Sequence, residues 1–139
     1  MARGILAADL CQRVAIPQAR HSQWVKRGLC RRIGKGGATE ADAVELAVAT
    51  ILMEALKDIE KTRRAVSQLR DHFDARVWDA GLTIVWDEQL ELAEWAGSDS
   101  EIGNLVRHGR SVRVLAAGGF LQDVVDSFRR LTADRLSEP

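Results

Sequence analysis

Residues 6–28 read LAADLCQRVAIPQARHSQWVKRG, and this stretch predicts the first two helices of the chain. Apolar residues recur one helical turn apart in its first half, which predicts a short amphipathic helix ending at Val14. Pro17 interrupts that helix, because proline disfavours a helical residue before it and suits the first turn of the next helix. A second helix is therefore expected from about Gln18, and Gly28 is placed to end it. Two short helices with so brief a turn between them form a helix-turn-helix.

Charge is distributed unevenly along the chain. The 139 residues hold 20 Lys+Arg and 20 Asp+Glu, so the formal net charge is zero. Residues 1–37 nevertheless contain eight basic residues and Asp9 as their one acidic residue, a net charge of +7. The rest of the chain carries 12 basic and 19 acidic residues, a net charge of −7. This polarity predicts a basic module that binds a polyanion, followed by an acidic module with another task.

A glycine-rich basic segment and a long helical region follow the first two helices. Residues 29–38, LCRRIGKGGA, predict a small basic wing made of a short strand or an extended arm. Thr39 then caps a new helix, since a hydroxyl before acidic residues satisfies the first turn and complements the helix dipole. No Gly or Pro occurs from Glu40 until Gly81, which allows one long helix or two nearly continuous ones.

A stripe of mostly apolar residues follows a 4,3 spacing along this helical region, as in a heptad seam. Its members are Val48, Leu52, Ala55, Ile59, Thr62, Val66, Leu69 and Phe73. The seam can pack against a partner chain or against the C-terminal module of the same chain. We expect self-association, because a single long helix cannot bury such a stripe alone.

The last 60 residues change character and predict a ββαβα module. Residues 82–86 (LTIVW), 89–95 (QLELAEW) and 111–117 (SVRVLAA) have the composition or alternation of strands. A short helix is expected between residues 98 and 109, and a last helix after residue 118. The predicted fold class is α+β, divided into a winged helix-turn-helix (1–56), a helical connector (57–78) and this module (79–139).

Composition excludes several classes of protein. A 46% hydrophobic chain of this length can bury a core, and no apolar run approaches the ~20 residues of a membrane span. No signal peptide is expected, and two cysteines do not make a disulfide framework, so we expect a cytoplasmic protein. His21, His72 and His108 stand in no metal-ligand spacing, and no phosphate-binding loop signature is present. We therefore expect no catalytic residues, no metal and no cofactor, and the chain is not expected to be an enzyme.

Several short motifs of the first 50 residues occur together in one known family. These motifs are Ala8-Asp9-Leu10, Ala15-Ile16-Pro17-Gln18, Trp24-Val25-Lys26-Arg27-Gly28-Leu29, and Thr39-Glu40-Ala41-Asp42 with Leu46. In this combination the segment resembles the DNA-binding domain of the mercury-resistance regulator (MerR) superfamily, a winged helix-turn-helix. The resemblance implies binding to double-stranded DNA and a role in transcription regulation. The chain departs from the family pattern at Ala15, where Gly is usual, at Pro17, where Ser or Thr is usual, and at Ser22, where Arg is frequent.

The second helix and the wing supply the candidate DNA contacts. Residues near the N-terminus of a recognition helix reach base edges, whereas flanking Lys and Arg hold phosphates. The candidates for reading bases or backbone are Gln18, Arg20, His21 and Ser22. The candidates for phosphate contact are Lys26, Arg27, Arg31, Arg32 and Lys35. The resemblance also places Trp24 near the DNA backbone, although a core position is the favoured role for this tryptophan.

The sequence is also consistent with other functions. An excisionase-like architectural factor that bends DNA uses the same small winged fold. A protein-interaction module that no longer binds DNA would agree with Ser22 and with a wing that lacks an aromatic residue. Trp78, Trp86 and Trp95 can form the core of the C-terminal module, which we favour, or line a pocket for a small ligand. The expected partners are double-stranded DNA, a second copy of the chain, and a protein or small ligand at the C-terminal module; no membrane partner is expected.

Overall fold

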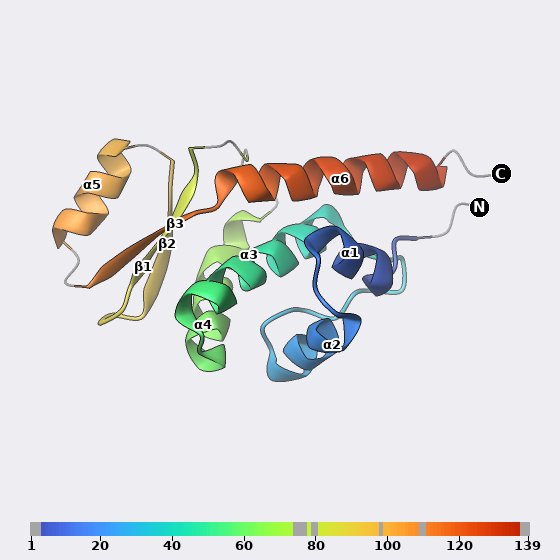
Figure 1. Cartoon of the computed structure of the whole chain (residues 1–139), viewed down its shortest axis with the longest axis horizontal. Helices are drawn as coiled ribbons and strands as arrows, with labels where there is room; N and C mark the ends of the chain where they lie inside the picture. The colour runs from blue at the N-terminus through green and yellow to red at the C-terminus, as the bar shows by residue number, and fades with distance from the viewer. Residues whose placement is uncertain (1–3, 74–77, 79–80, 98, 109–110, 137–139) are drawn as a thin grey trace.

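The structure, a computed structural model, describes residues 4–73, 78, 81–97, 99–108 and 111–136. It begins with α1 (Ala7–Val14) and α2 (Gln18–Arg27), close to the bounds expected from the sequence (Figure 1). Ala15 ends α1 in the left-handed conformation, with φ 61°, and Pro17 precedes the first residue of α2. Gly28 ends α2 with φ 82°, a value that glycine adopts without steric cost. Local sequence signals therefore place both helices correctly.

The long helical region is two helices and a short extension. α3 (Glu40–Leu56) begins with Thr39, whose hydroxyl accepts a hydrogen bond from the Asp42 amide. α3 ends at Lys57, which has φ 54°. Asp58 then caps α4 (Ile59–Leu69), and the 3-10 helix η1 (Arg70–His72) follows. This is the second of the two arrangements that the sequence allowed.

The heptad seam is covered within the chain, so the expectation of self-association through this stripe is wrong and the alternative of packing within the chain is the one observed. α3 and α4 pack against each other, and α4 also packs on β2 of the sheet described below. Six of the eight seam residues are buried within the chain; Ala55 and Ile59 are half-buried. Thr62, the polar member, is fully buried and its hydroxyl donates to the Asp58 carbonyl over 2.8 Å. Periodicity showed which face is buried, but the fold itself provides the surface that covers it.

The C-terminal part has the predicted ββαβα order. β1 (Thr83–Asp87) and β2 (Leu92–Ala96) form an antiparallel hairpin, and α5 (Asp99–His108) leads to β3 (Val112–Ala116). β3 pairs antiparallel with the other side of β1, so the strand order is β2–β1–β3. α6 (Gly118–Leu136) completes the described chain. The protein is thus a mixed helix-and-sheet, α+β structure.

α6, near the C-terminal end of the chain, packs beside α1, near its N-terminal end. It packs along α3 and reaches α1, so that α1 lies between α2 and α6 (Figure 1). Arg129 on α6 pairs with Glu40, and Arg135 pairs with Asp9 over 3.1 Å. A single cluster of buried apolar residues runs from Ile5 to Phe128. The predicted division into three parts is not tested by this arrangement and stays a prediction.

The tryptophans of the C-terminal part belong to the core. Trp78, Trp86 and Trp95 are each at most 9% exposed. The rings of Trp78 and Trp95 lie 5.3 Å apart, and Phe73 meets Trp95 edge-on at 6.5 Å. The favoured expectation, core packing, is confirmed for these three residues. No described helix combines the length and the apolar character that a membrane crossing requires.

Candidate nucleic-acid interface

α2 has one buried side and one fully exposed side. His21 and Trp24, three residues apart and therefore on the same side of the helix, are 6% and 5% exposed. The opposite side carries two rows of exposed residues at the spacing of three, four or seven that aligns side chains on a helix. One row is Arg20, Gln23 and Arg27, and the other is Ala19, Ser22 and Lys26. Side chains that donate hydrogen bonds or carry positive charge thus cover most of the outer face.

Two of the predicted DNA contacts lie in the interior. The structure gives Trp24 the core position that the sequence favoured for it, and His21 is buried as well. Burial lowers the pKa of the His21 imidazole, and the nearby carboxylates of Asp42 and Glu45 oppose this effect only in part. His21 is therefore held as a neutral interior residue. Neither side chain lies on the outer face of α2, so we no longer place them among the DNA contacts.

Arg31 has a structural partner that the sequence did not reveal. The Glu45 carboxylate is 1% exposed on its side chain, and Arg31 donates to it twice. The Arg31 amide donates to Oε1 over 2.6 Å, and its Nε donates to Oε2 over 3.1 Å. Arg70 on η1 donates to the same Oε2 over 2.8 Å and approaches the Leu29 carbonyl at 3.5 Å. This group of three side chains, the Glu45 clamp, holds the start of the basic segment against α3 and η1.

Residues 29–39, called the arm below, contain no regular helix or strand and turn at Lys35, so the short strand that the sequence allowed here is absent. The arm is fixed at its far end by the chain's N-terminal segment: the Ala38 amide donates to the Ile5 carbonyl over 2.7 Å. Gly37 has φ 97°, and a Cβ there would lie 2.7 Å from the Ile5 amide nitrogen. Only glycine fits this crossing. The arm is thus held by the Glu45 clamp at one end and by the crossing at Gly37 at the other.

Six cations in this part of the chain are exposed and make no ion pair with any residue that the structure describes. They are Arg13 at the end of α1, Arg20, Lys26 and Arg27 on α2, and Arg32 and Lys35 on the arm. The half-exposed Arg31 is the one cation of residues 4–37 that binds a carboxylate in the described structure. The acidic residues downstream therefore leave these six cations unpaired within the described part of the chain.

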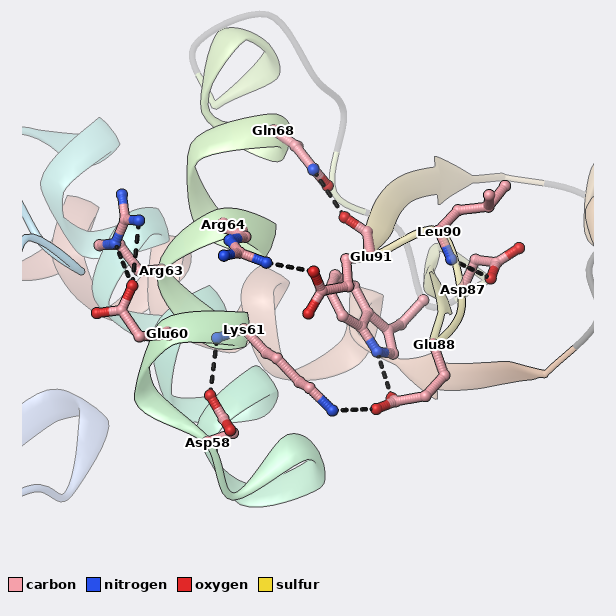
Figure 2. A network of polar contacts seen from close by, with 11 residues as sticks. Asp58, Glu60, Lys61, Arg63, Arg64, Gln68, Asp87, Glu88, Leu90 and Glu91 are labelled. Carbon is pink, nitrogen blue, oxygen red and sulfur yellow. Dashed lines mark hydrogen bonds and ion pairs between the residues drawn. The ribbon is translucent and has the colours of Figure 1, made fainter.

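In contrast to the six exposed cations of α1, α2 and the arm, two cations of α4 are paired with carboxylates of the β1–β2 hairpin. Lys61 on α4 pairs with Glu88, and Arg64 pairs with Glu91, so that α4 is joined to the β1–β2 hairpin (Figure 2). The Trp86 indole also donates to Glu88, over 2.7 Å. The hydrogen bond from Lys61 is the main cause that lowers the pKa of Glu88. These charges neutralise one another within the fold.

Two residues of this region were missed from the sequence. Gln23 lies in the centre of the outer face of α2, and its position three residues after Arg20 was the signal that could have found it. Glu45 is a lone acid in the apolar run from Ala43 to Ala49, a pattern that often marks a buried charge with a partner. The remaining predicted contacts are exposed as a DNA contact requires: Gln18, Arg20, Ser22, Lys26, Arg27, Arg32 and Lys35.

No protein-family model matches the chain, and no curated protein matches it either. Within the described part of the chain, no group of three or more His, Cys, Asp or Glu side chains is arranged to hold a metal ion. The exposed residues of α2 and the arm are the features of the described chain that bear on its function.

Proposed function

We propose that residues 1–56 bind double-stranded DNA as a winged helix-turn-helix similar to that of the MerR superfamily, and that the chain is a transcriptional regulator. One observation carries the proposal: the six exposed cations between Arg13 and Lys35 lack carboxylate partners among the described residues. Unpaired Lys and Arg side chains on a helix and an adjacent loop are what a phosphate backbone neutralises on binding.

In this proposal α2 enters the major groove. Its ten residues make a helix about 15 Å long, and the groove, about 12 Å wide, admits one helix. Gln18, Arg20, Ser22 and Gln23 face base edges, where Gln pairs with adenine and Arg with guanine. Lys26 and Arg27, near the end of the helix, lie where side chains contact the flanking phosphates.

The arm provides a second set of phosphate contacts. Arg32 and Lys35 are exposed and lie between the two points that fix the arm, the Glu45 clamp and the crossing at Gly37. A fixed arm loses little conformational entropy when it binds, which favours its cations as DNA contacts. Arg31 belongs to the clamp, so its substitution would change the fold as well as the charge.

The salt dependence of binding tests the proposal. The logarithm of the binding constant falls against the logarithm of salt concentration with a slope of about −0.9 for each phosphate neutralised. If the five free cations other than Arg20 contact phosphates, the slope for each bound chain is about −4.5. The double variant Arg32→Ala/Lys35→Ala should make the slope shallower by about 2. Fluorescence anisotropy with a labelled duplex at several salt concentrations measures this change.

A matched control removes two exposed cations elsewhere. The variant Arg107→Ala/Arg130→Ala changes the net charge equally but alters α5 and α6, so it should keep the wild-type slope. Equal slopes for the two double variants, or no binding to any duplex at low salt, would overturn the proposal. Duplexes selected from a random library then test base reading: Gln23→Ala should relax the preference at one base pair and leave the salt slope unchanged.

A further inference from the structure

The two edge strands of the sheet differ in whether their outward backbone groups have hydrogen-bond partners. On β2, the side-chain amide of Gln68 takes the place of a neighbouring strand. Its Nε2 donates to the Glu91 carbonyl over 2.9 Å, and its Oε1 accepts from the Ala93 amide over 2.6 Å; Figure 2 shows the first of these bonds. α4, which carries Gln68, packs along the same strand. The β2 edge is therefore closed to another chain.

The outer edge of β3 is open. The Glu88 amide donates to the Ser111 carbonyl over 2.8 Å, and the Ala117 amide donates to the Leu82 carbonyl over 3.2 Å. Both pairs lie in the β1–β3 register, and hydrogen-bonded pairs alternate along an antiparallel ladder. Residues 112, 114 and 116 consequently point their amide and carbonyl groups away from β1. No described residue bonds to these groups.

β3 also lacks the features that protect an edge strand. It contains no proline, and its single charged side chain, Arg113, donates to the Ala55 carbonyl over 2.6 Å. Val114 at its centre is 44% exposed, and Phe120 shortly after it is 38% exposed. Unpaired backbone groups beside exposed apolar side chains are a template for another strand.

We propose that a second copy of this chain pairs with the open edge, β3 against β3, and joins the two sheets into one. A two-fold axis at Val114 places each Val114 opposite its own copy and each Val112 opposite Ala116 of the other copy. Arg113 then faces Leu115, so no like charges meet. Because the three outward residues form hydrogen-bonded pairs in this register, six backbone bonds join the copies. A strand that is apolar and self-complementary in register fits its own copy.

This interface uses neither α2 nor the arm, so it does not depend on DNA binding. It also replaces the heptad seam as the surface of self-association, because the seam is buried within the chain. Sedimentation velocity of the full chain without DNA over a micromolar concentration range should give a species of twice 15.4 kDa.

Charged variants at the two-fold axis identify the surface. Val114→Lys and Val114→Glu should each weaken the dimer by about tenfold or more, since each brings two like charges together. An equimolar mixture of the two variants should restore the dimer, which a merely unfolded variant does not do. Leu92→Lys, which changes an equally exposed apolar residue on the closed β2 edge, is the control and should leave the dimer intact.

Two results would overturn the inference. One is a wild-type chain that stays monomeric at every concentration, and the other is a dimer that neither Val114 variant weakens. Absence of DNA binding would leave the inference unaffected, so its failure and that of the proposed function are distinguishable.

Discussion

Glu45→Gln is the most direct test of how the basic arm is held. The amide keeps the size of the side chain and one oxygen acceptor for the Arg31 amide, but it removes the negative charge that two guanidinium groups share. A hydrogen bond to a charged group contributes about 1.5–3 kcal/mol. Arg31 and Arg70 are 50% and 26% exposed on their side chains, so water compensates each guanidinium in part. We expect a loss of about 2–3 kcal/mol in the free energy of unfolding.

Glu45→Ala should be more damaging. It also leaves the Arg31 amide without an acceptor and opens a cavity beside α3, so the expected loss is about 3–5 kcal/mol. Urea unfolding followed by tryptophan fluorescence measures both variants. Glu54→Gln, which removes an exposed carboxylate from the same helix, should stay within about 0.5 kcal/mol of the wild type. A Glu45→Gln variant as stable as this control would show that the Glu45 clamp does not hold the arm and that Arg31 has no structural role there.

Three further predictions concern buried or constrained groups. Because burial lowers the pKa of His21 below its usual 6.5, the unfolded chain binds this proton first as pH falls, and the free energy of unfolding should decrease as the pH falls below about 6.5; His21→Gln should reduce that decrease in urea titrations at several pH values. Burial raises the pKa of Cys30 to about 12, so a thiol reagent at pH 8 should label it only after denaturant is added, and rapid labelling of the native protein would contradict its position. Gly37→Ala should lower the melting temperature and weaken binding to DNA, because its Cβ would meet the Ile5 backbone, whereas Gly34→Ala, with open space around it, should do neither.

The sequence predicted those parts of the fold that local signals determine. Pro17 and Gly28 mark the ends of helices by their own backbone chemistry, and alternation along residues 111–117 marks β3 without reference to any partner. The heptad seam shows the limit of this approach, because a periodic stripe reveals which face is buried but not what covers it. The seam is covered partly by α3 and α4 packing on each other and partly by α6 and β2, which lie far along the chain.

The sequence likewise predicted those parts of the candidate interface that depend on local signals, and missed those that depend on contacts far along the chain. Positive charge on α2 and the arm is visible in the sequence, and the exposure of residues such as Arg20 and Lys26 agrees with it. The burial of His21 follows from its helical spacing to Trp24, a signal that was present but unused. The role of Arg31 was not predictable, because its partner Glu45 is 14 residues away and the second cation, Arg70, lies 25 residues beyond that.

The return of α6 to the beginning of the chain determines which fragments can be studied alone. A fragment that ends at residue 56 would lose Leu121, Val125 and Phe128, and the apolar side of α3 would then face water. Such a piece would aggregate or unfold for reasons unrelated to its surface charge. Deletions from the C-terminus should therefore reduce solubility and DNA binding together, and loss of binding in a truncated protein would not locate the binding residues in the part removed.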